Sequence, residues 1–66
     1  MKNKKQEFLK DIGKRCKKFR IEKLQVKQEY VAKQLNMSQQ SISNFENGKN
    51  DNMHILAWYI EWGFVL

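Results

Sequence analysis

Side chains that can pair with nucleotide bases are concentrated in one short stretch of the chain, residues 39–44. Apart from Ile42, every residue in it carries an amide or hydroxyl group: Gln39, Gln40, Ser41, Ser43 and Asn44. An amide side chain carries both a donor and an acceptor, so it can bind N6 and N7 of adenine in the major groove. Such residues are also common on any exposed helix face. The elements around the stretch must therefore decide between the two interpretations.

Residues suited to other chemistry are too few to form a site. Cys16 is the single cysteine and His54 the single histidine, so neither a disulfide nor a cluster of metal ligands can form within the chain. No nucleophile lies beside a base in a catalytic pattern. The sequence therefore predicts no enzyme activity, no catalytic residue, no metal and no cofactor.

The charge of the chain favours a polyanionic partner. The formal net charge is +6, from 13 Lys and Arg against 7 Asp and Glu, and the basic residues are concentrated in residues 1–20. An excess of this kind is typical of nucleic-acid binding, although a lysine-rich solvated surface would give the same composition. No segment resembles a signal peptide, and the apolar run 55–66 is too short to cross a bilayer. We therefore expect a soluble, cytoplasmic protein with no membrane partner.

The elements that hold residues 39–44 are predicted to be helices only. There is no proline, and an apolar stripe predicts a first helix from about residue 6 to residues 20–23, formed by Phe8, Ile12, Cys16 and Phe19. Residues 24–26 would form a short connection. Residues 1–5 lack an apolar anchor and are predicted to be a flexible basic arm, which leaves 6–66 as a single domain.

Start and stop signals predict three further helices. The second covers about residues 27–35 and ends at Asn36, a residue that tolerates the left-handed conformation. Ser38 is a good N-cap for the third, which directs Ile42 and Phe45 inward and ends at Asn47-Gly48. The last would run from about residue 52 to 62 and stop at Gly63. The predicted fold is a compact, all-α bundle of four helices.

The second and third helices are joined by a turn of only about three residues. Helices joined so tightly cross at a steep angle, which is the helix-turn-helix geometry. Ala32 supplies a small side chain where the two helices meet. Residues 28–46 are therefore predicted to form a helix-turn-helix, with residues 38–46 as its second helix.

The motifs in this region resemble those of the XRE family, which includes the repressor and Cro proteins of lambdoid phages. The similarity covers about residues 12–51 and rests on a set of residues at the family's spacing: Gln28, Glu29, Ala32, Leu35, Ser38, Ile42, Ser43, Phe45, Glu46 and Gly48. Three positions depart from the family pattern. Lys27 stands where a Ser or Thr N-cap is usual, Asn36 replaces a turn glycine, and Asp51 replaces a common proline.

The resemblance implies a lambda-repressor-like fold and a role in binding double-stranded DNA through the major groove. Residues 39–41 are similar to the start of the recognition helix in a lambdoid phage repressor, where such glutamines contact bases. We therefore expect base contacts from Gln39, Gln40, Ser43 and Asn44, with adenine preferred. Phosphate contacts are expected from Gln28, Ser41, Asn47, Lys49, Arg15 and Lys18, and less strongly from Lys2, Lys4 and Lys5. Glu46 is expected to be structural and to pair with a basic residue such as Arg20.

The last predicted helix is apolar on nearly every face, which suggests a partner beyond its own core. The family normally continues into a fifth helix that often forms the dimer contact, and the given sequence stops at Leu66. We expect a homodimer interface in its place, formed by Trp58, Trp62, Phe64, Val65 and Leu66. Alternatively, these aromatic residues only enlarge a small core.

A two-fold dimer would place its recognition helices about 34 Å apart, on a near-palindromic operator. The resulting prediction is a transcriptional regulator, and a repressor in particular. One alternative is an antitoxin or other DNA-binding adaptor whose aromatic C-terminal part binds a second protein. Another is a basic amphipathic protein that binds membrane surfaces through its first helix, which would leave the glutamines unexplained.

Overall fold

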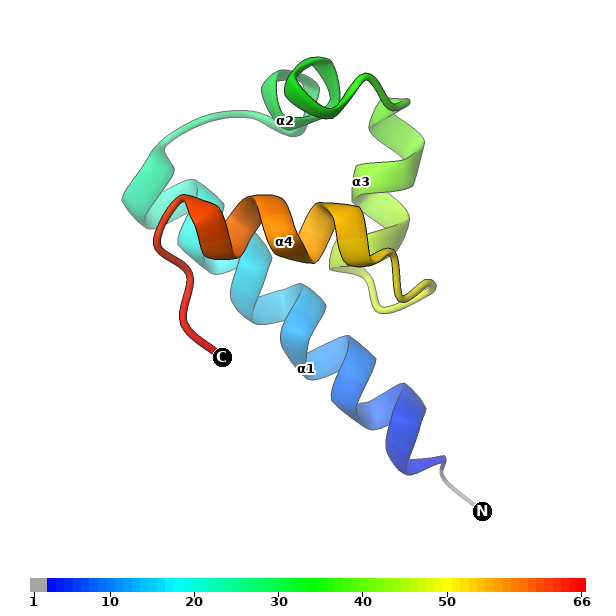
Figure 1. Cartoon of the computed structure of the whole chain (residues 1–66). Helices are drawn as coiled ribbons and strands as arrows, with labels where there is room; N and C mark the ends of the chain where they lie inside the picture. The colour runs from blue at the N-terminus through cyan, green and yellow to red at the C-terminus, as the bar shows by residue number, and fades with distance from the viewer. Residues whose placement is uncertain (1–2) are drawn as a thin grey trace.

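The computed structural model describes residues 3–66, which form helices joined by turns and short loops, with no strand in that range. The elements are α1 (Lys4–Phe19), the π-helical segment η1 (Arg20–Leu24), α2 (Gln28–Leu35), α3 (Gln39–Glu46) and α4 (Met53–Glu61). Figure 1 shows α2 almost end-on and α3 along its length, so the two axes cross steeply. The predicted all-α, four-helix architecture with its helix-turn-helix is confirmed.

Helix α1 begins earlier than the apolar pattern predicts. Asn3 is the N-cap, and its side-chain Oδ1 accepts a hydrogen bond from the backbone N–H of Lys5 at 2.9 Å. Lys4 and Lys5, which were predicted to lie in a flexible arm, therefore belong to the first turn of the helix. Residues 1–2, including Lys2, lie outside the described part of the chain.

The apolar stripe of α1 is buried only where other helices cover it. Ile12 and Cys16 are buried and Phe19 is half-buried, but Phe8, at the N-terminal end of the stripe, is 58% exposed. The N-terminal half of α1 extends beyond the rest of the bundle (Figure 1). Burial raises the pKa of the Cys16 thiol to about 12, with a further contribution from the charge of Glu46. The thiol is therefore protonated and inert at neutral pH.

The connection between α1 and α2 is more regular than predicted. The helix continues without a break into η1, and the chain then turns at Gln25, whose φ of 56° is left-handed. The backbone N–H of Gln25 donates to the carbonyl of Arg20 at 2.7 Å. This wider turn keeps Arg20 on the inner side of the chain, where its Nη1 donates to the carbonyl of Val26 at 2.8 Å.

The turn of the helix-turn-helix is held by local hydrogen bonds. Asn36 has the predicted left-handed conformation, with a φ of 54°, and the N–H of Met37 donates to the carbonyl of Ala32 at 2.9 Å. Ser38 is the predicted N-cap of α3, and its Oγ accepts from the N–H of Ser41 at 3.1 Å. Lys27, at the N-cap of α2, makes no side-chain cap. Helix α2 therefore lacks the side-chain cap that the family's Ser or Thr would supply.

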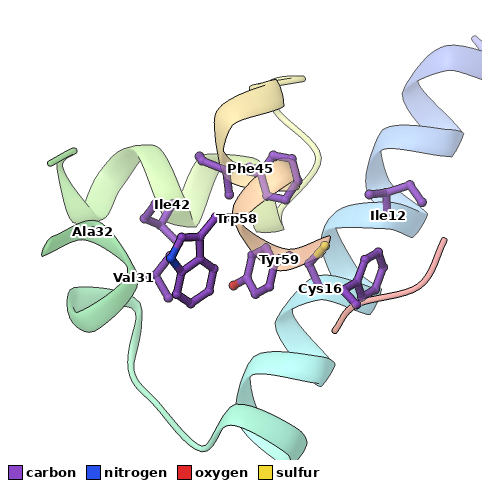
Figure 2. Packing of buried hydrophobic residues seen from close by; sticks show 10 residues of the cluster. Ile12, Cys16, Val31, Ala32, Ile42, Phe45, Trp58 and Tyr59 are labelled. Atoms are coloured by element: carbon purple, nitrogen blue, oxygen red, sulfur yellow. The ribbon is translucent and has the colours of Figure 1, made fainter. Parts of the chain in front are cut away.

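The core lies between the helix-turn-helix and α4. Val31 and Ala32 of α2 and Ile42 of α3, whose inward position was predicted, are buried in one cluster with Trp58 and Tyr59 of α4. Figure 2 shows Trp58 beside Val31 and Ile42, with Tyr59 on the side toward Cys16. The orientation of α3 is therefore set by its inward residues, and its opposite face is left outside.

Gly13 allows α1 to cross the end of α3 at backbone contact distance. A Cβ atom on Gly13 would lie 2.4 Å from the carbonyl oxygen of Phe45 and 2.6 Å from that of Glu46. Gly13→Ala should therefore force the two helices apart and lower the free energy of unfolding by about 1–3 kcal/mol. Urea unfolding followed by tryptophan fluorescence measures this, with Lys14→Ala as an exposed control on the same helix. An unchanged midpoint for Gly13→Ala would contradict the close crossing.

Candidate nucleic-acid interface

The outer face of α3 carries the four residues predicted to contact bases. Gln39 and Gln40 are exposed, and Ser43 and Asn44 are half-buried, while Ile42 and Phe45 on the opposite face are buried. Nε2 of Gln40 donates to Oδ1 of Asn44 at 2.9 Å, one turn further along the helix. The structure thus places these polar groups together on a surface that the core holds in a fixed orientation.

Gln28, the first residue of α2, lies beside the start of α3. Its Nε2 donates to Oε1 of Glu46 at 2.9 Å, and its Oε1 is 3.4 Å from Nε2 of Gln39. Because Gln28 is held on both sides, its amide bridges the buried end of α3 and the exposed start of the same helix. The two helices therefore present their amide groups as one surface.

Glu46 is the centre of a buried polar cluster, as its predicted pairing with Arg20 suggested. Nε of Arg20 donates to Oε2 at 2.9 Å and Nη2 donates to Oε1 at 3.1 Å. The two residues are 6% and 3% exposed. Burial of the guanidinium works against its charge, but the hydrogen bond and charge of Glu46 outweigh this effect, so the pKa of Arg20 is raised. The guanidinium of Arg20 therefore keeps its charge inside the domain.

Tyr59 of α4 is a member of this cluster that the sequence analysis missed. Its hydroxyl donates to Oε2 of Glu46 at 2.5 Å, and its ring is fully buried. Burial, followed by the hydrogen bond and charge of Glu46, raises the pKa of Tyr59, so the hydroxyl remains a donor. A signal was present, because a tyrosine in an otherwise apolar helix must find a polar partner when buried.

Three of the residues predicted to contact phosphate lie in α3 or just after it: Ser41, Asn47 and Lys49. Asn47 and Lys49 follow α3 directly and are exposed, and Nδ2 of Asn47 lies 3.5 Å from Oγ of Ser43. The Oγ of Ser41 lies 2.9 Å from that of Ser38. The Ser41 hydroxyl therefore forms a hydrogen bond with the hydroxyl of Ser38, the N-cap of the same helix.

Arg15 and Lys18, which were also predicted to contact phosphate, lie beside the C-terminal tail. Nη2 of Arg15 donates to the carbonyls of Val65 and Leu66 at 3.2 and 2.8 Å, and its guanidinium lies 5.5 Å from the centre of the Phe64 ring. Both basic residues line a groove with Phe64 and Val65, away from the polar face of α3. Because basic residues are spread around α1, the sequence alone did not show which of them lie near α3.

Two of the five residues predicted at a dimer interface belong to the core instead. Trp58 is 7% and Phe64 6% exposed, because Phe64 folds back against Phe19 and Tyr59. For these two, the alternative that they enlarge a small core is the correct one. Trp62, Val65 and Leu66 remain exposed to 54%, 80% and 59%.

The described residues show no arrangement for other kinds of site. Over residues 3–66, no group of His, Cys, Asp and Glu side chains is placed to hold a metal ion. Among the same residues, no helix is long and apolar enough to cross a membrane.

Comparison with known proteins gives one match. A family model described as a helix-turn-helix matches residues 17–51, more than half of the chain and the whole of α2, the turn and α3. No curated protein and no solved structure matches the chain. The chain belongs to the Cro-type helix-turn-helix (XRE) family of DNA-binding transcriptional regulators.

Proposed function

We propose that the chain is a repressor that binds a near-palindromic operator as a homodimer and recognises bases with α3. The observation that carries this proposal is the outer face of α3. It holds amide groups at positions 39, 40 and 44 and a hydroxyl at position 43, and Gln28 supports it from the side. Amides in the major groove favour adenine, so the operator half-site should contain adenines at the positions that Gln39 and Gln40 reach.

Support for a homodimer comes from apolar side chains that the fold leaves uncovered. Trp62, Val65 and Leu66, in the last five residues of the described chain, are 54%, 80% and 59% exposed. Large apolar side chains gathered in one region commonly mark a protein interface. A two-fold axis through this region would present two copies of α3 to successive major grooves, about 34 Å apart.

The same apolar region supports a second candidate function, that of an antitoxin-like adaptor. In that case a different protein covers Trp62 and its neighbours, while α3 still binds DNA. Co-expression and purification distinguish the two functions. A stoichiometric second protein on a monomeric chain favours the adaptor, and a homodimer free of other proteins favours the repressor.

Base recognition can be tested by selecting bound sequences from random duplexes. Gln39→Ala and Gln40→Ala should each lose the preference at one position of the half-site, because a good amide–adenine pair provides about 1–3 kcal/mol of discrimination. Gln34→Ala, at an exposed glutamine on α2, is the matched control and should select the same sequence as the unchanged chain. If the α3 variants bind more weakly but keep the original base preference, the assignment to bases is wrong.

A further inference from the structure

The first turns of α1 and the loop between α3 and α4 form the walls of an open polar groove, in which Lys10 joins Asn47 and Lys49, two residues already expected to contact phosphate. Its volume is about 620 Å³. Lys5 and Lys10 line it from α1, and Lys49 lines it from the loop. The groove begins where α3 ends, since Asn47 also lines it.

The two walls of this groove are held together by backbone contact. Gly48 has a φ of +75°, and a Cβ atom placed on it would lie 2.6 Å from Cα of Lys10. Only a glycine allows the loop to lie this close to α1. Gly13 makes a similar contact with the end of α3. The backbone of α1 at Lys10 is therefore held in a fixed position relative to the recognition helix.

The charge of the groove is suited to an anion. Three lysines and one aspartate line it, and Oδ2 of this aspartate, Asp51, lies 3.6 Å from Nζ of Lys5. Side-chain amides of Asn3, Gln6 and Asn50 add neutral donors to the lining.

We propose that this groove holds a backbone phosphate of the bound duplex, so that α1 adds a DNA contact beyond those of the helix-turn-helix. Lys10 is the principal ligand of this phosphate, and Lys49 assists it from the loop. Asp51 weakens phosphate binding because its carboxylate pairs with Lys5. The inference rests on the proposed binding of α3 in the major groove, because that placement brings the backbone past the end of α3. A phosphodiester fits better than an apolar partner, because the lining is mostly charged groups and amides.

The salt dependence of DNA binding tests this proposal. Each phosphate contact adds about 0.9 to the slope of the logarithm of affinity against the logarithm of salt concentration. Lys10→Gln should lower the slope by about this amount on both the selected operator and an unrelated duplex. The ratio of the wild-type affinity to the variant affinity should therefore be about threefold smaller at 200 mM than at 50 mM salt. Lys23→Gln removes the same charge from a residue that lines the groove beside Phe64, and should leave the slope unchanged.

A variant with the opposite expected effect strengthens the test. Asp51→Asn removes the carboxylate that lines the groove among the described residues and frees Lys5, so it should tighten binding several-fold on every sequence. Circular dichroism checks that all variants fold, which is expected because the three side chains are exposed.

Failure of this inference is distinguishable from failure of the proposed function. If the unchanged chain selects an operator but Lys10→Gln keeps the full slope, the groove does not hold a phosphate. Weaker binding by Asp51→Asn would also overturn the proposal. If the unchanged chain selects no sequence, the repressor assignment fails, and the slopes on an unrelated duplex still decide whether Lys10 contacts the backbone.

Discussion

Glu46→Ala is expected to leave the domain largely unfolded under conditions in which the unchanged chain is folded. The carboxylate accepts from Arg20, Gln28 and Tyr59, so its loss leaves a buried guanidinium and a buried hydroxyl without their acceptor. Removing one partner of a buried ion pair costs about 3–5 kcal/mol. At about 0.05–0.15 kcal/mol per residue, this approaches the whole stability of so small a domain.

Two probes can measure this effect. Urea unfolding followed by the fluorescence of buried Trp58 gives the free energy of unfolding. Reaction of Cys16 with a thiol reagent reports the unfolded fraction, because the thiol is buried and its pKa is raised to about 12 in the folded domain. Glu61→Ala, at the exposed end of α4, is the control and should change the stability by less than about 0.5 kcal/mol.

A second substitution separates the buried charge from a simple loss of packing. If the unpaired guanidinium is the main cost, Arg20→Met added to Glu46→Ala should recover part of the lost stability, because no buried charge remains. Equal stabilities for Glu46→Ala and the unchanged chain would show that the cluster contributes little. A further loss in the double variant would point to packing by the Arg20 side chain instead.

Local signals in the sequence were sufficient for most of the fold. Asn36 and Ser38 each act on the backbone within a few residues, so their roles in the turn were predictable from residue type alone. The inward positions of Ile42 and Phe45 follow from helical spacing. The pairing of Glu46 with Arg20 spans 26 residues and was anticipated only through the resemblance to the family.

Features that depend on which helix covers which face were not predictable in this way. Phe8 continues the apolar stripe of α1 but is 58% exposed. Arg15 and Lys10 are both basic residues of α1, yet one binds the C-terminal tail and the other lines the groove beside the end of α3. Phe64 follows a glycine whose φ of +111° turns the chain back onto the core.

The buried cluster joins the stability of the domain to its recognition surface. Glu46 holds Gln28, and Gln28 lies within reach of Gln39, so the start of α3 is positioned partly from its own far end. A variant that disturbs Glu46 without unfolding the chain should therefore also loosen Gln39. Stability must accordingly be measured beside DNA binding for every variant near this cluster.

Trp62→Gln is expected to convert the proposed dimer to a monomer and to lower affinity for a full operator by about 100-fold or more. The side chain is 54% exposed and stacks at a tilt against Trp58, with ring centres 5.9 Å apart, so it supplies an uncovered apolar surface at the end of α4. A dimer binds its second half-site at a high effective concentration, which commonly adds a factor of about 10²–10⁴. Affinity for an isolated half-site should remain unchanged, because Trp62 lies outside α3.

The choice of variant and control makes this prediction specific. Glutamine adds no charge, so it does not alter attraction to DNA, and urea unfolding shows whether Trp58 remains packed. Phe8→Gln removes a similarly exposed aromatic side chain from the far end of α1 and should leave both assembly and operator affinity intact. Sedimentation equilibrium then decides the question. A monomeric unchanged chain at high micromolar concentration, or a Trp62→Gln chain that still dimerises, would rule out an interface centred on Trp62.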